Sequence, residues 1–306
     1  MNRAPAQALV CVETALSRRR RGGPRRTVQL TQRDRQLLAF AAENQFVVAG
    51  QVALLLEASE GAADARMRAL SHADYLVREC RLRAEPATVQ ITRLGLNAIG
   101  SDLSVPHALD LATYRHELGV GWLMVMARRG RFGPLQAVIS ERRMRSEDAR
   151  ARGQSPGPEE WSGGCFQSSE AGCCTGLRGR HGVRLGGTGP AGGERLHYPD
   201  LVLVADTGHR IAFELELTPK ARTRREAIMA GYAADPAVDM AIYLVERPQI
   251  KNALTRSVAR LGVSHLVRVQ SVTTGHEPTA AARGGVAERH QVPAAIAGAT
   301  GGGAER

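Results

Sequence analysis

The chain has 306 residues, 43% of them hydrophobic and only 4% aromatic, so it is long enough for two compact domains with mainly aliphatic cores. Its formal net charge is +11, and of the 41 basic residues only Lys220 and Lys251 are not arginine. This balance favours a nucleic-acid partner, because arginine binds phosphates and guanine edges in a bidentate manner. Codon bias in a GC-rich genome is the alternative source of the arginines.

The sequence predicts a cytoplasmic chain that does not cross a membrane. No run approaches the roughly 20 apolar residues of a membrane span. The basic run Arg18–Arg21 follows the weak apolar stretch at the N-terminus, whereas a signal peptide has the opposite order. The odd number of cysteines, five, agrees with reduced thiols in a cytosol.

Composition divides the chain into structured and weakly structured parts. The N-terminal segment is basic and broken by Gly-Gly-Pro, the middle is rich in Gly, Ser, Arg and Cys, and the end is rich in Gly, Ala and Thr. We therefore expect a disordered basic arm over 1–26, a first domain over 27–105, a second domain over 106–149 and 196–270, a flexible insertion over 150–195 and a disordered tail over 271–306.

The first domain is predicted to be three short helices followed by a β-hairpin. Thr31 and Asp34 have the spacing of a capping box and start the first helix. Apolar residues at helical spacing predict further helices over Val48–Glu57 and Ala63–Leu76. Two short strands, Val77–Arg83 and Thr88–Thr92, complete the order of a winged helix-turn-helix, in which the third helix enters the major groove of DNA.

The third helix and the hairpin carry the candidate DNA-binding residues. In a winged helix the third helix reads the groove and the hairpin contacts the backbone. The alternative is a generic helical module that binds protein. The candidates for double-stranded DNA contact are Arg66, Arg68, Arg78, Arg81 and Arg83.

The second domain is predicted to be an α+β or α/β fold with a mixed sheet. Its elements follow the order helix, strand, β-hairpin, helix, strand, which is the core order of the PD-(D/E)xK nuclease-like fold. Thr218-Pro219 has the form of a helix start, and the apolar run to Val245 indicates a buried parallel strand. The predicted elements are Leu111–Arg128, Leu135–Ser140, Leu201–Val204, Arg210–Leu217, a helix from Thr218 to about Tyr232, Asp239–Val245, a helix that Gly262 ends, and His265–Val269.

The hairpin of this domain carries the candidate chemistry. Asp206-Thr207-Gly208 fits a three-residue loop, which places Asp200 opposite Glu214. Glu216 lies two residues further and therefore on the same face. Because like charges at opposed positions are destabilising, a Mg²⁺ ion held by these three carboxylates would offset the cost and activate a water for attack on a phosphodiester.

Two other interpretations of these acids remain open. The hairpin can be exposed, with solvated carboxylates paired to nearby arginines such as Arg222. A register shift of one residue would also move Asp200 to the opposite face and remove the site. A zinc site from Cys165, Cys173, Cys174 and His181 is disfavoured, because adjacent cysteines lack the usual ligand spacing.

Several segments together resemble the replication-relaxation family of plasmid and integrative-element proteins. They are Leu30–Asp34, Ile91–Gly95, Tyr114–His116, Ser140–Arg142, Pro199–Asp200 and Phe213–Lys220. The resemblance implies a role in plasmid replication, DNA relaxation or mobilisation, with a relaxase or a replication initiator as a partner. Active nucleases of the related fold place lysine two residues after the first glutamate. Here that position holds Glu216, and Lys220 is the candidate that reaches back to orient water.

Three functional hypotheses follow. The first is a DNA-binding protein of a mobile element without catalysis of its own. The second is a Mg²⁺-dependent nuclease or nickase with Asp200, Glu214, Glu216 and Lys220 as catalytic residues. The third is a winged-helix transcriptional regulator. The alternative to all three is the product of a damaged gene, whose middle segment no longer folds.

Overall fold

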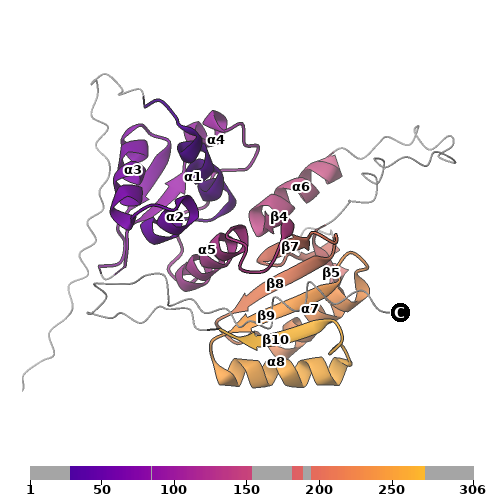
Figure 1. The fold of residues 1–306 in the computed structure, drawn as a ribbon. Coiled ribbons are helices and arrows are strands. Elements are labelled where there is room, and N and C mark those ends of the chain that lie inside the picture. Colours follow the sequence, from indigo (N-terminus) through magenta and orange to yellow (C-terminus); the bar gives the residue numbers. More distant parts are fainter. Residues whose placement is uncertain (1–27, 84, 154–180, 189–193, 273–306) are drawn as a thin grey trace, which may run out of the picture.

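The computed structural model describes residues 28–83, 85–153, 181–188 and 194–272 (Figure 1). Together they form a mixed α+β protein with no barrel among the described residues. No helix in these ranges combines the length and the apolar composition that a membrane crossing needs.

The N-terminal unit is three helices, a β-hairpin and a fourth short helix. Its small antiparallel sheet has the order β1-β3-β2. The buried face of the helices carries Leu37, Phe40, Met67 and Leu70, which are fully buried. The elements are α1 (Gln32–Glu43), β1 (Val47–Val48), α2 (Ala49–Leu56), α3 (Glu60–His72), β2 (Leu76–Glu79), β3 (Thr88–Ile91) and α4 (Arg93–Ala98).

The start of α1 confirms the predicted capping box. The Asp34 backbone N–H donates to Thr31 Oγ1 at 3.3 Å, and the Thr31 N–H donates to Asp34 Oδ2 at 2.7 Å. The third helix differs from the expectation. It begins at Glu60 and ends at His72, because Ser59 caps its first turn by accepting the Ala62 N–H at 3.2 Å.

The second unit is a five-stranded mixed sheet with helices on both faces. The strand order is β10-β9-β8-β7-β4, in which β4, β7 and β8 are antiparallel while β8, β9 and β10 are parallel. The elements are α5 (Tyr114–Arg128), β4 (Leu135–Ser140), α6 (Glu141–Gly153), β5 (Val183–Thr188), β6 (Glu194–His197), β7 (Leu201–Ala205), β8 (Arg210–Glu216), α7 (Arg222–Ala234), β9 (Met240–Val245), α8 (Pro248–Leu261) and β10 (Val267–Ser271).

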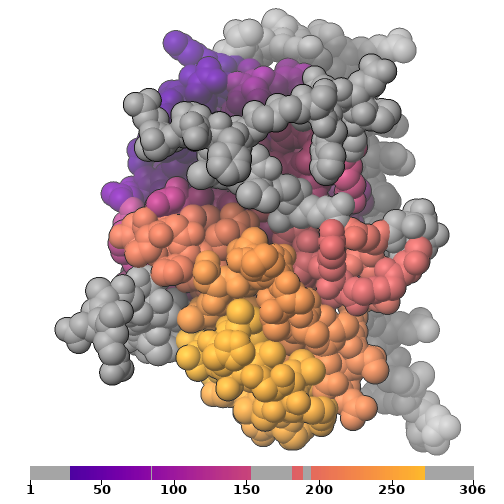
Figure 2. All heavy atoms as spheres, turned by 90° about the vertical axis from the view of Figure 1, so that its right-hand side faces the viewer, coloured from indigo at the N-terminus to yellow at the C-terminus, as the bar shows by residue number. Residues whose placement is uncertain are grey.

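Alternation along β8 assigns each helix to a face of this sheet. Phe213 and Leu215 belong to the core under α5, whereas Ala212 packs in the core with α7 and α8. In the space-filling view the part of the chain from β8 to β10, which includes α7 and α8 and is coloured orange to yellow, forms one lobe below the indigo N-terminal unit (Figure 2).

The two units share a core through α5, which lies between them (Figure 1). Gln51 of α2 donates to the Leu118 carbonyl of α5 at 3.0 Å. Helix α6 also holds α1, because Arg142 donates to the Ala42 carbonyl at 2.9 Å and Arg143 binds Glu43 at 2.9 Å. These contacts fix the N-terminal unit against one edge of the larger sheet.

Several sequence expectations need correction. Helix α7 begins at Arg222 and not at Thr218-Pro219, because the Glu216 carboxylate accepts the Lys220 backbone N–H at 3.1 Å and holds the intervening residues in a turn. The expected apolar stripe of α5 begins at Tyr114, and Leu111 is 55% exposed. Strand β10 lies two residues beyond its expected place, so Ser271 ends a strand and does not start the tail.

The segment expected to be a flexible insertion, 150–195, contains regular structure at both ends. Helix α6 continues to Gly153, and β5 pairs with β6 as an antiparallel hairpin. A glycine-rich composition concealed this pairing, since Gly186 and Gly187 have positive φ angles that suit an irregular turn inside the hairpin. The basic arm, the tail beyond 272 and Cys165, Cys173 and Cys174 lie outside the described residues.

Candidate functional site

The hairpin formed by β7 and β8 has the predicted register. Leu201 pairs with Phe213 and Val204 with Arg210, and the Ala205 N–H donates to the His209 carbonyl at 2.9 Å. Gly208 takes the left-handed conformation, with φ of 88°, that the three-residue loop requires. The paired residues end at Leu201, and the Asp200 backbone N–H donates to the carbonyl of Phe213 at 3.0 Å, so the position of Asp200 opposite Glu214 stays a prediction.

Asp200 leaves the strand at this point, and its carboxylate bonds to the backbone of the neighbouring strand. Its Oδ2 accepts the Leu215 backbone N–H at 2.7 Å, a bond that a continued β7 would otherwise make. The same oxygen lies 3.1 Å from Nε2 of His116, which α5 supplies. The side chain therefore lies at the edge of the sheet and faces α5.

Glu214 and Glu216 lie on the other face of the sheet, towards α7. Both are almost fully buried, at 1% and 2% exposure. Glu214 Oε1 accepts from the Tyr232 hydroxyl and lies 2.5 Å from His197 Nε2. The Lys220 ammonium lies 2.5 Å from Glu216 Oε2 and 3.8 Å from Glu214 Oε2, so it bridges the two glutamates.

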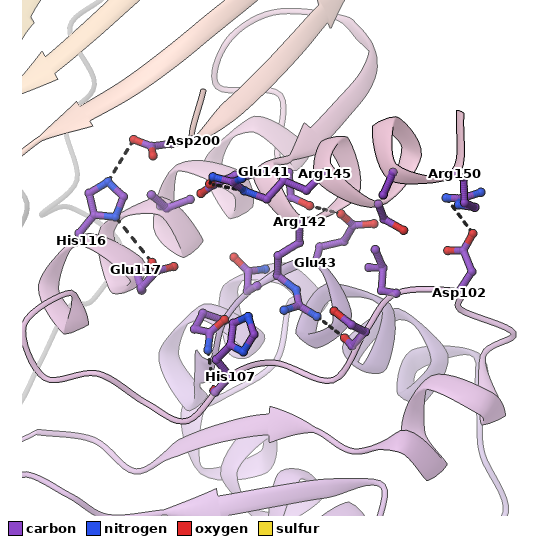
Figure 3. Close-up of a pocket in the computed structure, with 18 residues that line it drawn as sticks. Glu43, Asp102, His107, His116, Glu117, Glu141, Arg142, Arg145, Arg150 and Asp200 are labelled. Atoms are coloured by element: carbon purple, nitrogen blue, oxygen red, sulfur yellow. Dashed lines mark hydrogen bonds and ion pairs between the residues drawn. The ribbon is translucent and has the colours of Figure 1, made fainter. Parts of the chain in front are cut away.

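Asp200 lines a cavity of the described residues that Glu214 and Glu216 do not line. A cavity of about 640 Å³ lies between the N-terminal unit, α5 and α6, and Asp200 is on its wall while Glu214 and Glu216 are not (Figure 3). Lys220 interacts electrostatically with all three carboxylates, and a site that they share stays a prediction.

Electrostatics keep His116 cationic and Asp200 ionised. Burial alone would lower the pKa of His116, but the adjacent Asp200 carboxylate raises it to about 11. Burial favours a neutral Asp200, yet the His116 charge and the hydrogen bond from Leu215 lower the pKa of its carboxyl. The two residues therefore form a charged pair over the whole neutral range.

Lys220 supplies the positive charge beside Glu214 and Glu216, as His116 does beside Asp200. Burial raises the pKa of Glu216 above its usual value, and the Lys220 charge opposes this effect. Burial would lower the pKa of Lys220, but Glu214 and Glu216 raise it, so the amine stays protonated. The sequence prediction that Lys220 reaches back towards the strand agrees with this geometry.

Each of the three carboxylates has a protein partner. Lys220 holds Glu216, Tyr232 and His197 hold Glu214, and His116 holds Asp200. In the part of the chain that the structure describes, no three His, Cys, Asp or Glu side chains are grouped so that they could coordinate a metal ion. A cation would first have to displace the Lys220 ammonium.

The cavity brings together segments that are distant in sequence. His116 and Glu117 come from α5, Glu141 and Arg145 from α6, and Asp200 from the start of β7 (Figure 3). Glu141 pairs with Arg145 at 2.5 Å, and its backbone N–H donates to the Asp200 carbonyl at 3.3 Å. Three of the segments that carry the family resemblance, Tyr114–His116, Ser140–Arg142 and Pro199–Asp200, thus meet at one place.

Sequence reasoning did not select His116 or Glu141 as site residues. A single histidine in an amphipathic helix gives no sign that a distant aspartate will pair with it. The only available signal was their position inside the segments that carry the resemblance. Topology, and not spacing, brings these residues to Asp200.

The candidate DNA-binding arginines lie on the surface of the N-terminal unit, and most are paired with acids. Arg66 differs from the others because its partner, Asp34, is buried. It makes two hydrogen bonds of 2.5 Å to Asp34 and so stabilises α1. Arg68 and Arg78 both contact Asp64 at 3.2 Å. Arg81 pairs with Glu79 at 2.5 Å, and Arg83 is exposed.

Comparison of the chain with protein-family models, with curated proteins and with solved structures finds no match. The resemblance to the replication-relaxation family therefore stays a prediction from the residues that carry it.

Proposed function

We propose that this chain is a DNA-binding protein of a plasmid or other mobile element, without catalysis of its own. In this proposal residues of the N-terminal unit form a winged helix in which α3 approaches the major groove and the β2–β3 hairpin lies on the backbone. The larger sheet is a nuclease-like fold that supports assembly. Replication, DNA relaxation or mobilisation is the process in which it would act.

The observation that carries the proposal is the contact of Arg68 and Arg78 with the same acid. Asp64 receives Arg68 from α3 and Arg78 from β2, each at 3.2 Å. One helical and one hairpin arginine therefore project on a single surface. A helix and its wing that bind one duplex need cations on a shared surface, where they can contact its phosphates.

Their pairing with Asp64 does not oppose this function. Arg68 is 54% and Arg78 33% exposed, and ion pairs at such sites contribute at most about 1 kcal/mol. Both arginines can exchange the carboxylate for phosphate at little cost. The α3 surface beside them presents Ala62 and Ala65, whose small side chains let the helix approach a groove closely.

The pairing of Asp200 and Glu216 with cationic side chains supports DNA binding without cleavage. Lys220 and His116 already neutralise Glu216 and Asp200, so a developing negative charge on phosphate finds no free cation at these carboxylates. A nuclease would need Asp200, Glu214 and Glu216 to turn towards a common metal. A transcriptional regulator would use the same α3 surface and differs only in its DNA site.

Fluorescence anisotropy with a labelled duplex of about 20 base pairs tests the proposal. We expect the full chain to bind, with affinity that falls steeply as salt rises, and the double variant Arg68→Ala/Arg78→Ala to have a salt slope smaller by about two. The control variant Arg131→Ala/Arg268→Ala removes the same charge from exposed residues elsewhere. Equal affinities of the two variants would contradict the proposal.

Incubation with supercoiled plasmid separates binding from cleavage. With Mg²⁺ or Mn²⁺ present, the proposal expects plasmid to remain supercoiled after removal of the protein. Nicking that Asp200→Ala abolishes would instead establish the nuclease.

A further inference from the structure

Three parallel strands of the larger sheet end at the same edge. Glu216 of β8 pairs with Val245 of β9, Val245 pairs with Ser271 of β10, and these are the last residues of the three strands (Figure 1). The chain therefore enters α7 and α8 from one edge of the sheet, which we call the carboxyl edge. Residues that directly follow these strands, or that contact the residues at their ends, lie at this edge.

Three basic side chains lie at the carboxyl edge beside β9 and β10. Arg247 is the second residue after β9 and is exposed. Lys251, near the start of α8, donates from Nζ to Ser271 Oγ at the end of β10, at 3.2 Å. Arg115, in the first turn of α5, lies 3.7 Å from Glu246, the residue that precedes Arg247. A contact or the chain itself thus fixes each of the three to the end of a strand.

Exposed carboxylates do not balance these three cations. Among the described residues the ion pairs of this edge are those of Arg115 and Lys220 with glutamates, and neither Arg247 nor Lys251 takes part in one within 4.0 Å. The pair of Arg115 with Glu246 is weak, because Arg115 is 56% exposed and such pairs contribute at most about 1 kcal/mol. The first turn of α8 contains no acid. The edge can therefore accept an anionic partner without losing strong contacts of its own.

The start of α5 joins the carboxyl edge to the β2–β3 hairpin. Leu82 in the hairpin loop packs against the apolar cluster that contains Leu109 and Tyr114. Arg81 of the same loop donates to the Leu109 carbonyl at 3.2 Å. Arg115 directly follows Tyr114, so the hairpin loop and the carboxyl edge both adjoin the first turn of α5. The surface proposed to contact the DNA backbone therefore continues from the hairpin towards the larger sheet.

We infer that the carboxyl edge, defined by Arg115, Arg247 and Lys251, is a second contact surface for the phosphate backbone of the duplex that the N-terminal unit binds. The inference rests on the proposed DNA-binding function and extends its footprint across α5 to the sheet. Glu85 and Asp110 lie between the hairpin and the edge, so phosphate contacts are expected on either side of them. Contacts to phosphate position a duplex without reading its bases, so sequence reading stays with α3.

The salt dependence of duplex binding by the full chain tests this surface. Arg115→Gln/Arg247→Gln removes two cations from exposed positions, where substitution costs little stability. Each phosphate contact contributes about 0.9 to the slope of log affinity against log salt, so we expect a slope smaller by about two with a labelled duplex of about 20 base pairs. The matched control, Arg131→Gln/Arg268→Gln, keeps the wild-type slope, because Arg131 follows the far end of α5 and Arg268 lies near the start of β10.

Amide hydrogen exchange gives a second readout. With a saturating duplex we expect slower exchange over 246–252 in the wild type, and a smaller effect in Arg115→Gln/Arg247→Gln. A slope equal to that of the control, or unchanged exchange over 246–252, would overturn the inference. The proposed function would stand in that case if Arg68→Ala/Arg78→Ala still lowers the slope.

Two further outcomes separate the inference from its alternatives. A wild type that binds no duplex at all would overturn both the inference and the proposed function. Binding to anionic phospholipid vesicles that Arg115→Gln/Arg247→Gln loses, with an unchanged slope for duplex, would assign the carboxyl edge to a membrane surface and overturn the inference alone.

Discussion

Lys220 is the position where a single substitution tests the site most sharply. Its ammonium lies 2.5 Å from Glu216 and 3.8 Å from Glu214, and both carboxylates are nearly inaccessible to solvent. Lys220→Met keeps the length of the side chain and removes the charge. Two adjacent buried carboxylates then remain without their common cation.

The expected cost is large for one substitution. Removing one partner of a buried ion pair destabilises a protein by about 3–5 kcal/mol, and the 30% exposure of Lys220 favours the lower end. A loss of about 3 kcal/mol lowers the Tm of a domain of this size by roughly 6–12 °C. The loss grows with pH, because without Lys220 the pKa of Glu216 rises further above its unfolded value. Stability is then present at low pH and is lost as pH rises through the folded pKa.

Urea unfolding of the full chain at pH 5 and pH 8 measures this effect. Lys251→Met is the matched control, because it removes the other lysine of the chain, whose ammonium donates to Ser271 Oγ at 3.2 Å and forms no ion pair with any residue that the structure describes. Its cost is within about 0.5 kcal/mol. If Lys220→Met unfolds at the same urea concentration as Lys251→Met, Lys220 does not hold the glutamates. A Tm of the wild type that rises with Mg²⁺ would show that a cation displaces the lysine.

Three further predictions concern other parts of the structure. We expect His116→Gln to be less stable than the wild type, and the difference to be greatest near pH 6. The difference shrinks as pH rises towards the pKa of about 11 that His116 has in the folded chain. Urea unfolding at a series of pH values measures it, and the opposite trend would show that the histidine is neutral. Gly95→Ala places a Cβ 2.4 Å from the backbone oxygen of Tyr75 and costs about 1–3 kcal/mol of stability. The control Gly61→Ala meets no atom within 4 Å and is neutral or stabilising. Equal Tm values of the two variants would refute the close packing at Gly95. Asp34→Asn weakens both the capping box and the bidentate bond from Arg66 and costs about 2 kcal/mol in chemical unfolding, so an unchanged midpoint would contradict that pairing.

The sequence predicted well those elements whose start, end or turn depends only on residues close in sequence. The capping box of Thr31 and Asp34, the strand Leu135–Ser140 and the left-handed Gly262 at the end of α8 depend on residues close in sequence, and each is present. The register of the β7–β8 hairpin followed from its three-residue loop for the same reason.

Long-range contacts account for the differences. Glu216 binds the backbone of Lys220 and delays the start of α7, which the Thr-Pro signal could not reveal. Asp200 turns out of its strand because Leu215 N–H and His116 both bind its carboxylate. The strands β5 and β6 pair with each other across glycine-rich sequence, where neither hydrophobic alternation nor composition gave a signal.

The candidate DNA surface shows a similar limit. Sequence position identified the arginines of α3 and the hairpin, but not the acids that accompany them, since Asp64 lies beneath Arg68 and Arg78 only in the folded chain.

Hydrogen–deuterium exchange of the full chain, with and without a saturating duplex, tests the central claim most directly. The proposal predicts slower amide exchange in α3 and in the β2–β3 hairpin when DNA is bound, since these elements would contact the groove and the backbone. Unchanged exchange across 60–91 at a duplex concentration that saturates binding would contradict the assignment of this surface to DNA.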